Sequence, residues 1–506
     1  MAESDQTVFD ALCDHTRQTA TLASIESVLG WDERTQMPSA NAEYRAEQMT
    51  LLSGMIHQRN TDPRVGDWLA QLAESPLAAE PHSDTAATIR VLQRKFEKQK
   101  KLPQALVEEL TRTAVMGQQT WQAAREKDDY AQFCPIVEKM FELKRQQADA
   151  LGHDGCRYDA LLDDFEPEES TENVDRVLRS LREELVPLVA AIAESSRRPP
   201  LELLKRRYPI ETQQSFGREV ATQIGFDFAR GRLDESAHPF CNGLGPHDTR
   251  ITTRYDEHFM PSALFGTMHE AGHGIYDQGL RTEWYGLPPG SYISLGIHES
   301  QSRMWENQVG RSEAFWRHFF PHAQRAFPEA LADAARDEFY FAINNVEPSL
   351  IRVEADEATY NLHILIRFEL ELALIEGELK PADAPAAWNE KYREYLGIEP
   401  KNDAEGILQD IHWSFGAVGY FPTYSLGNLY AAQFFEKADE QLGGLADQFA
   451  RGEFAPLRQW LQAQIHERGE CYTAAELVRE VTGDDLSHDA LMRHLRGKLV
   501  PLYDLS

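Results

Sequence analysis

Two histidines and a glutamate in the stretch TMHEAGHGIYDQG, residues 267–279, have the spacing of a metal-dependent hydrolase site. His269 and His273 are four residues apart, so on a helix their side chains share one face, with Cβ atoms about 5–6 Å apart. Both imidazoles can then reach one ion at about 2.0–2.1 Å. Glu270 lies beside the open coordination position, where a carboxylate can take a proton from a water. The pattern predicts a catalytic metal site; the alternative is two surface histidines on an amphipathic helix.

A catalytic zinc usually takes three protein ligands, so the motif requires one more. Four side chains in the following segment are candidates: His298, Glu299 and Glu306 on the next predicted helix, residues 291–310, and Glu283 in the turn before it. Glu299 and Glu306 are seven residues apart and share a helix face, so spacing does not choose between them. A carboxylate on a rigid helix is the chemistry we prefer for this ligand.

The elements that must hold these residues are predominantly helices. Residues 261–279 begin with Pro261 and continue with apolar residues at helical intervals. Elsewhere the apolar pattern predicts helices at 173–196, 359–379 and 426–442, a strand at 250–256, and breaks at 196–200, 287–290 and 397–406. We therefore expect a mainly α fold that forms a single domain over residues 1–506, with a small β element near the metal motif.

Composition excludes several classes of function. With 42% hydrophobic and 10% aromatic residues the 506-residue chain is globular, and it contains no apolar run long enough to cross a bilayer. The start lacks the features of a signal peptide, and the five cysteines are scattered, so we expect a cytoplasmic protein without a disulfide framework. A net charge of −31 disfavours binding to nucleic acid or to anionic membranes.

The acidity has two interpretations. Acidic residues outnumber basic ones 82 to 51, and lysine is scarce beside arginine. In a salty cytoplasm, surface carboxylates hold water and high salt screens their repulsion, so one interpretation is a halophilic host. The other is an ordinary acidic protein. Lysine depletion favours the first, because acidity alone does not require it.

Several short blocks, taken together, resemble one family of enzymes. The chain is similar to the carboxypeptidase Taq family of HExxH metallocarboxypeptidases, peptidase family M32, over nearly its whole length. The matching blocks are VLGWDERTQMPSANAEYRAEQ at 28–48, HPF at 238–240, DTRIT at 248–252, HEAGH at 269–273, HES at 298–300, IRVEAD at 351–356 and GILQDIHW at 406–413. The resemblance implies that Glu299 is the third metal ligand, that a large helical fold encloses a deep substrate groove, and that the protein is a homodimer.

A carboxypeptidase also requires a cation for the free carboxylate of its substrate. Arginine suits this role because its planar guanidinium can donate two hydrogen bonds to a carboxylate. The matching blocks supply Arg250 and Arg352, with His238 as a further donor. For each arginine the alternative is an internal salt bridge, for which Asp248 and Asp356 are the neighbouring acids.

The oxyanion that forms during hydrolysis requires a donor as well. Tyr420 and Tyr424 lie four residues apart in a segment rich in Gly and Pro, and resemble the paired tyrosines of related helical HExxH oligopeptidases. Aromatic packing in the core is the alternative. His412 is a competing donor, and Asp410 is expected either to orient that imidazole or to cap a helix. We assign Tyr420 and His412 to catalysis and Tyr424 to substrate binding.

These residues predict a zinc carboxypeptidase that releases single C-terminal amino acids with broad specificity. Zinc at His269, His273 and Glu299 is expected, although cobalt or manganese suits the same ligands, and Glu270 is the expected general base. The expected partners are peptide substrates and a second copy of the chain. A zinc oligopeptidase or dipeptidyl-type peptidase would share the same metal residues. A helical scaffold with an idle motif, or a metal hydrolase that acts on another bond, fits less of the pattern.

Overall fold

The computed structural model describes residues 4–505, and most of them lie in helices. The chain forms two compact units, each built from three separate stretches. The first comprises Met1–Lys100, Pro200–Ile343 and Phe434–Asp484, and the second comprises Lys101–Pro199, Asn344–Gln433 and Asp485–Ser506. The single domain expected over residues 1–506 stays a prediction. Among the described residues no helix combines the length and apolarity required to span a bilayer.

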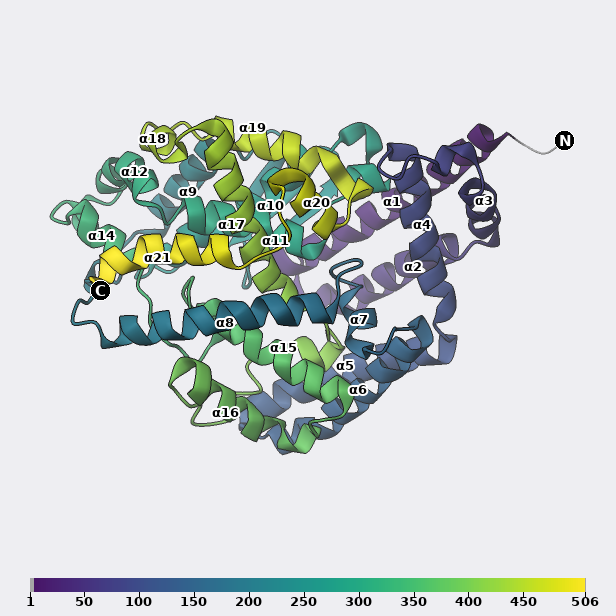
Figure 1. The fold of residues 1–506 in the computed structure, drawn as a ribbon, viewed down its shortest axis with the longest axis horizontal. Helices are drawn as coiled ribbons and strands as arrows, with labels where there is room; N and C mark the ends of the chain where they lie inside the picture. The colour runs from purple at the N-terminus through teal and green to yellow at the C-terminus, as the bar shows by residue number, and fades with distance from the viewer. Residues whose placement is uncertain (1–3, 506) are drawn as a thin grey trace. The chain divides into compact units, whose positions relative to one another are not determined.

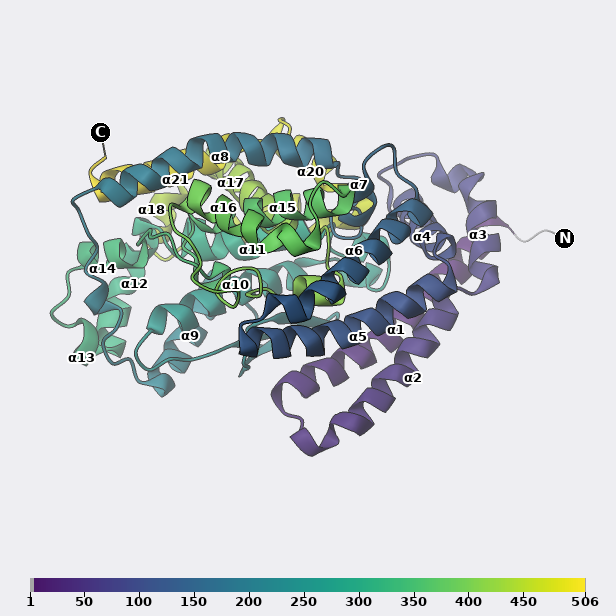
Figure 2. The ribbon, with the colours of Figure 1, turned by 90° about the horizontal axis from the view of Figure 1, so that it is seen from below.

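The first unit combines helices with a small sheet. Its main helices are α1 (Asp5–Thr35), α2 (Ala42–Asn60), α3 (Pro63–Ala73), α4 (Asp84–Lys101), α9 (Ile210–Ile224), α10 (Met260–Gly279), α11 (Leu295–Arg303), α12 (Glu313–Ala326), α13 (Pro328–Leu331), α14 (Arg336–Ile343), α18 (Leu445–Ala450), α19 (Ala455–Gln464) and α20 (Ala474–Thr482). Helices α1 and α2 pack side by side as a hairpin (Figure 2). A π-helix, η6 (Met304–Val309), directly continues α11.

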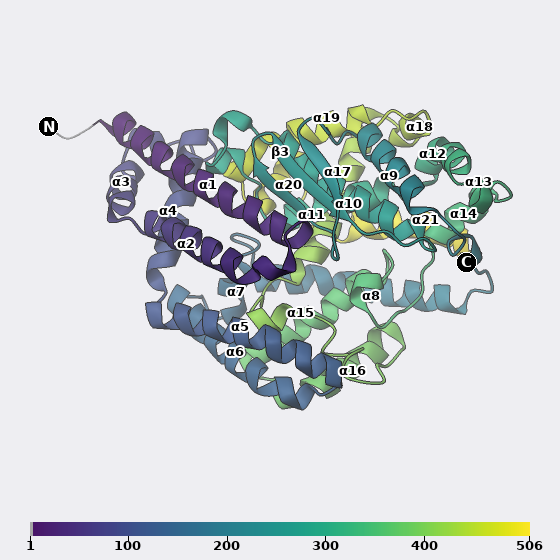
Figure 3. The same ribbon diagram turned by 180° about the vertical axis from the view of Figure 1, so that it is seen from behind.

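The sheet lies against the helix that carries the metal motif. Strand β3 (Asp248–Thr253) is central, with β1 (Gly231–Glu235) parallel on one side and β2 (Cys241–Gly245) antiparallel on the other. Helix α10 packs on β3, as Figure 3 shows. The expected β element near the motif is thus confirmed, although β3 begins and ends earlier than the predicted strand at 250–256.

The second unit is helical throughout its regular elements in the described part of the chain (Figure 1). They are α5 (Gln104–Lys127), α6 (Tyr130–Leu151), α7 (Arg157–Leu162), α8 (Thr171–Glu194), α15 (Tyr360–Glu376), α16 (Ala384–Leu396), the first half of α17 (Pro422–Leu442) and α21 (Asp489–Tyr503). Helix α15 contacts α6, α7, α8 and α16, and most of its side chains are buried. This explains why its sequence is apolar on nearly every face.

The predicted helices are present with shifted ends. Helix α8 covers the stripe from Val174 to Leu188, whose apolar members are buried, and Ser170 caps its N-terminus by accepting a hydrogen bond from the backbone of Asn173. Helix α15 ends at Gly377, which adopts a left-handed φ of 79°. Helix α17 begins four residues before the predicted stretch, at Pro422. The predicted helix at 291–310 begins only at Leu295, after Ser294 as its cap.

Candidate metal centre

Helix α10 presents the motif because its other faces are anchored in the protein interior. Pro261 occupies its first turn, where a missing N–H costs nothing, and Leu264, Phe265, Met268 and Ile275 are buried. Gly272 lies between the two histidines in the chain. A Cβ on this residue would lie 2.6 Å from the carbonyl oxygen of Gln301, so the absence of a side chain lets α11 approach the backbone of α10.

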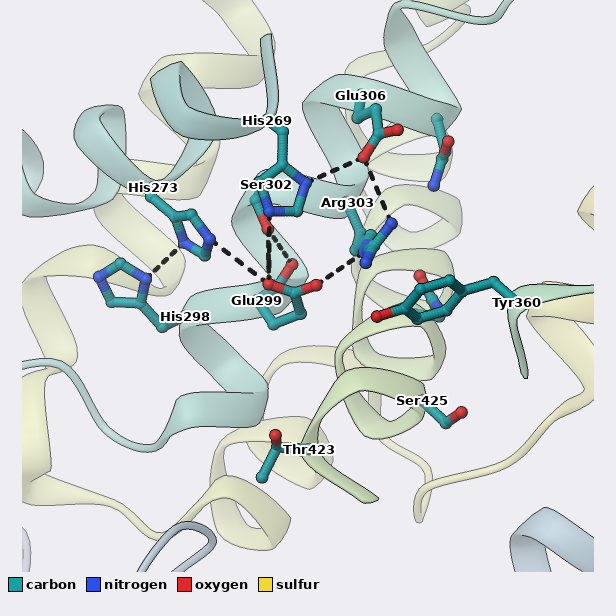
Figure 4. A network of polar contacts seen from close by, with 12 residues as sticks. His269, His273, His298, Glu299, Ser302, Arg303, Glu306, Tyr360, Thr423 and Ser425 are labelled. Carbon is teal, nitrogen blue, oxygen red and sulfur yellow. Dashed lines mark hydrogen bonds and ion pairs between the residues drawn. The ribbon is translucent and has the colours of Figure 1, made fainter. Parts of the chain in front are cut away.

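This close approach brings three potential metal ligands together (Figure 4). The Oε2 atom of Glu299 lies 3.6 Å from Nε2 of His269 and 3.4 Å from Nε2 of His273. Ligand atoms of all three residues lie within 4.8 Å of one another. Four ligands placed tetrahedrally at about 2.1 Å from an ion stand about 3.4 Å apart. Two imidazole nitrogens and one carboxylate oxygen at these separations fit a divalent metal ion.

A carboxylate and two arginines surround this group. Glu306 accepts a hydrogen bond of 2.9 Å from Nδ1 of His269, and Arg303 donates from Nε to Oε1 of Glu299 at 2.7 Å. Glu306 also lies 3.4 Å from both Arg303 and Arg311. Burial alone would raise the pKa of Glu306, but His269 and the two arginines outweigh it and lower the pKa to about 2. The Glu306 carboxylate is therefore ionised at neutral pH.

His273, unlike His269, has a second histidine as the neighbour of its Nδ1 atom. Nδ1 of His273 lies 2.5 Å from Nδ1 of His298, and Nε2 of His298 lies 3.0 Å from Oδ1 of Asp277. An imidazole that offers Nε2 to a metal carries its proton on Nδ1, so His273 donates to His298. His298 must then carry its own proton on Nε2 and donate it to Asp277. His298, a candidate ligand from the sequence, thus contacts the Nδ1 side of His273 and is not one of the three grouped ligands.

Glu270 stands apart from these contacts. Its side chain is 7% exposed, and it makes no hydrogen bond or ion pair within residues 4–505. Burial raises its pKa to about 7, although His269 opposes the shift. A buried carboxylate that holds no structural partner is available to exchange a proton with a water or a substrate.

Two of the predicted substrate-binding residues lie in or next to the sheet: Arg250 in β3 and His238 in the connection between β1 and β2. Arg250 donates to Asp248 through Nε at 2.9 Å and Nη2 at 2.8 Å, and its guanidinium lies 4.4 Å from the ring centre of Trp31. This is the internal salt bridge that the sequence offered as the alternative role. His238 is exposed, and its backbone carbonyl accepts a hydrogen bond from Ser236.

In the second unit, Arg352 belongs to a buried cluster around Asp410. Arg352 donates through Nε and Nη2 to Oδ1 of Asp410 at 3.0 and 2.8 Å, and through Nη1 to the hydroxyl of Tyr360 at 3.0 Å. Arg367 donates to Oδ2 of the same carboxylate at 2.6 Å. Asp356, the acid expected to pair with Arg352, instead accepts hydrogen bonds from the backbone N–H groups of Ala358 and Thr359, just before α15. Two guanidinium groups on one carboxylate leave a net positive charge.

Three further predicted residues lie close together in the same unit. The ring centres of His412 and Tyr420 are 5.5 Å apart, those of Tyr420 and Tyr424 are 5.3 Å apart, and those of His412 and Tyr424 are 6.4 Å apart. Asp410 lies 3.9 Å from Nδ1 of His412, which is too far for an orienting hydrogen bond, and it does not cap the short helix η9 (His412–Phe415) that follows it. Burial lowers the pKa of His412 to about 4, so the imidazole is neutral.

The segment that carries these donors is tied to a buried acid, Glu371 of α15. It accepts hydrogen bonds from the indole N–H of Trp413 at 2.8 Å, the backbone N–H of Gly419 at 3.1 Å and the hydroxyl of Tyr158 at 2.7 Å. Glu371 thereby holds both ends of the loop between His412 and Tyr420.

Sequence reasoning missed the residues that support the predicted ones. Two of them follow a simple rule, since Asp277 lies four residues after His273 on α10 and Arg303 four residues after Glu299 on α11. Residues at this spacing share a helix face, so the sequence contained a signal for both. Glu371 and Arg367 had no such signal, because their partners lie more than 40 residues away in the chain.

Known proteins share both the sequence and the fold. The model of the carboxypeptidase Taq (M32) metallopeptidase family matches residues 11–499. The chain is 46% identical to thermostable carboxypeptidase 1 of Thermus thermophilus, covering 98% of this chain and 99% of that protein, and 38% identical to carboxypeptidase 1 of Bacillus subtilis, covering 94% and 95%. The crystal structure of an M32 carboxypeptidase from Deinococcus radiodurans, 39% identical, superimposes with a TM-score of 0.95 over 99% of this chain and all of that one.

Proposed function

Because the chain belongs to the carboxypeptidase Taq (M32) family of metallopeptidases, we propose that it removes single C-terminal residues from peptides at a zinc ion held by His269, His273 and Glu299. The chain is a metallocarboxypeptidase, a hydrolase of peptide bonds. The metal identity, the general base and a broad specificity are the finer parts of the proposal.

The proposal rests mainly on the grouping of His269, His273, Glu270 and Glu299 at one face of α10. Two imidazole nitrogens lie 3.6 and 3.4 Å from the same oxygen of Glu299, and the neighbouring Glu270 side chain makes no hydrogen bond or ion pair among the described residues. A His, His, Glu set suits zinc, while cobalt and manganese accept the same ligands. A bound divalent ion supplies Lewis acidity to the scissile carbonyl and to the attacking water.

In this proposal Glu270 is the general base. It accepts a proton from the attacking water and returns that proton to the leaving amine. Its buried position, with a pKa raised to about 7, suits a group that both takes and gives a proton near neutral pH. Arg303 keeps Glu299 oriented, since it occupies the oxygen that does not face the imidazoles.

The resemblance also carries roles for residues outside α10 and α11. Arg352 is the preferred candidate for the substrate carboxylate, because its cluster holds two guanidinium groups against one acid. Arg250 already donates two hydrogen bonds to Asp248, which makes it the weaker candidate, and His238 remains a proposed donor. Tyr420 and His412 are proposed oxyanion donors, and Tyr424 is a proposed substrate contact.

The direct test is mass spectrometry of a peptide with a blocked N-terminus, digested by metal-loaded enzyme with and without a chelator. Stepwise loss of single C-terminal residues that stops with the chelator supports the proposal. Internal fragments or dipeptides would instead support the oligopeptidase that shares the same metal residues. A C-terminally amidated copy of the peptide should resist cleavage, because it lacks the carboxylate.

Glu270→Gln separates chemistry from metal binding. We expect it to retain the metal, measured by elemental analysis, and to lose nearly all turnover. Glu211→Gln, an exposed substitution on α9, is the matched control and should keep both. Loss of the metal from Glu270→Gln would assign Glu270 a structural role instead.

A homodimer and a cytoplasmic location complete the proposal. The hairpin of α1 and α2 exposes five apolar side chains: Ile25, Val28, Tyr44, Leu51 and Met55. Leu51 is 67% exposed and Tyr44 60%, and clustered apolar side chains of this kind mark interaction surfaces. Light scattering on the wild type and on Leu51→Glu tests the dimer: the variant should be monomeric if this hairpin forms the interface.

A further inference from the structure

A cavity of about 410 Å³ lies at the C-terminal end of α10 in the first unit. Its walls come from the end of that helix, the following turn, Gly225 and Arg230 after α9, and α19 with the segment after it. The volume falls within the range of about 300–1,000 Å³ typical of small-molecule sites. None of the proposed metal ligands lines it.

His466 provides an acceptor in this cavity. Its Nε2 lies 3.0 Å from Oε1 of Gln301, and the amide nitrogen of Gln301 donates to Ser300, which fixes the orientation of the amide. Nε2 of His466 must therefore be the protonated nitrogen. Burial lowers the pKa of His466 to about 3, so the ring is neutral and Nδ1 keeps a free lone pair.

That lone pair has no donor. Nδ1 of His466 makes no hydrogen bond with the described residues, although the side chain is only 1% exposed. Gly279 lines the cavity beside it, and a Cβ at that position would lie 2.2 Å from Nδ1. The absence of a side chain at Gly279 thus leaves room for the imidazole to pack against the end of α10. A buried acceptor without a partner costs free energy, which a ligand with an N–H group would recover.

Arg458 provides a cation that no carboxylate of the described residues binds directly. Its guanidinium makes no hydrogen bond or ion pair within the described part of the chain, whereas the neighbouring Arg281 is held by both oxygens of Asp84. Arg230 donates through Nε to Asp227 and through Nη1 to the carbonyl of Gln278. Arg458 is therefore the cation available to an incoming carboxylate.

Glu283 provides the opposite charge. This residue was a candidate metal ligand from sequence, but it lies in the short helix η4 (Thr282–Trp284) and lines the cavity. Its carboxylate has no hydrogen bond or ion pair among residues 4–505. The lining of this cavity thus contains the guanidinium of Arg458, the carboxylate of Glu283 and the buried neutral acceptor of His466.

We propose that this cavity binds a free α-amino acid, whose carboxylate pairs with Arg458 and whose ammonium group is held by Glu283 and Nδ1 of His466. A simple anion would leave Glu283 and His466 without a partner, and a simple amine would leave Arg458 without one. A zwitterion satisfies all three groups. The inference rests on the proposed function only for the origin of the ligand, since a carboxypeptidase releases free amino acids.

The cavity also has a route to the metal group. The ring of His466 lies 4.9 Å from that of Tyr276, which lies 5.2 Å from His298, the partner of His273. Residue 279 ends the same helix that carries His269 and His273. A bound amino acid therefore touches the elements that orient the predicted metal ligands, as a product-sensing site would require.

Calorimetry on the metal-loaded full chain tests the proposal with L-alanine, propionate and ethylamine, which separate the two charges. We expect L-alanine to bind and the other two to bind at least tenfold more weakly. Arg458→Gln and Glu283→Gln should each weaken L-alanine binding by about tenfold or more, since each removes a charge-assisted contact. Glu283 is exposed, so Glu283→Gln remains informative if Arg458→Gln does not fold.

Arg352→Gln is the comparison that locates the binding. Unchanged affinity for L-alanine in this variant supports the cavity, because Arg352 is the proposed anchor for the substrate carboxylate. Affinity that is lost in Arg352→Gln and kept in Arg458→Gln would place the amino acid at that anchor and overturn the proposal. Propionate that binds as tightly as L-alanine, or no binding of L-alanine, would overturn it too. Peptide cleavage is assayed separately, so an inactive wild type that still binds L-alanine refutes the proposed function alone.

Discussion

Glu306 accepts a hydrogen bond of 2.9 Å from Nδ1 of His269, while Glu299 lies 3.6 Å from Nε2 of the same ring. The two carboxylates that share a helix face thus meet one imidazole at opposite nitrogens. Glu306 fixes the tautomer that leaves Nε2 free for a metal, and its negative charge makes that nitrogen a stronger ligand.

Glu306→Gln should therefore weaken metal binding by about 10–100-fold while the fold persists. The amide can still accept the hydrogen bond, but it brings no charge, and Arg303 and Arg311 then lose their shared partner. Competition with a chromophoric chelator measures the affinity. Glu329→Gln, an exposed change in the same unit, is the control. Equal affinity in both variants would show that Glu306 serves only as an ion-pair partner for the arginines.

His298→Phe should also weaken metal binding, by about tenfold or more. The variant leaves the Nδ1 proton of His273 buried without an acceptor and removes the imidazole donor from Asp277. The same chelator titration applies, with exposed His258→Phe as the control. Nitrogen NMR shifts of His273 report its tautomer directly, and an unchanged tautomer in the variant would contradict this role for His298.

Arg352→Met should raise KM for peptides with a free C-terminus by about 10–100-fold, the worth of a charge-assisted hydrogen-bond pair. Arg250→Met is the paired experiment, because its guanidinium is already held by Asp248 and should matter less for KM. The reverse ranking would transfer the carboxylate anchor to Arg250. Melting temperatures of both variants show whether an altered KM reflects a damaged fold.

Glu371 should make stability depend on pH. Burial raises its pKa from 4.5 to about 7, despite three donated hydrogen bonds. An acid with a raised pKa in the folded state binds more protons when folded, so its contribution is fully present below pH 4.5 and is lost as pH rises to about 7. The raised pKa of Glu371 therefore contributes on the order of 3 kcal/mol to the free energy of unfolding at low pH.

The test compares melting temperatures of the wild type and Glu371→Gln between pH 4.5 and 7.5. Glutamine cannot titrate, and its amide group would face the donors Tyr158 and Gly419, so the variant is less stable. The gap between the two proteins should shrink as pH rises. Exposed Glu378→Gln should show a constant gap. A gap for Glu371→Gln that widens with pH would mean that the carboxylate is ionised throughout.

The net charge of −31 predicts that stability and activity rise with salt. Raising the ionic strength from 0.1 to 1 M shortens the screening length from about 10 to about 3 Å, which weakens repulsion among the surface carboxylates. Melting temperature and turnover measured across this range of KCl check the expectation. Full activity in dilute buffer would favour the ordinary acidic protein over the halophilic one.

Local patterns in the sequence predicted local structure well. The period of apolar residues located α8, α10 and α15, and Pro261 marked the start of α10. Strands β1 and β2 were not located, because GRLDE and CNGLG contain few of the residues that favour strands. They form by pairing with β3, which is a tertiary effect.

Partners that lie far apart in the chain escaped prediction. Asp356 lies four residues from Arg352, yet it accepts hydrogen bonds from the backbone of Ala358 and Thr359, while Asp410 pairs with Arg352 from 58 residues away. Spacing alone did not choose between Glu299 and Glu306, and the choice of Glu299 came from the family resemblance. Only the packing of α10 on α11 decides which nitrogen of His269 each carboxylate meets.

The contact at Gly272 has a consequence for which ions the protein can accept. The gap between the helix with the imidazoles and the helix with the carboxylate is set where backbone meets backbone, so no side-chain rotation can adjust it. A fixed separation between the two helices favours ions of one radius over larger ones. A lineage that came to depend on a larger cation would have to separate the two helices. Replacing Gly272 by alanine is the smallest substitution that would force them apart.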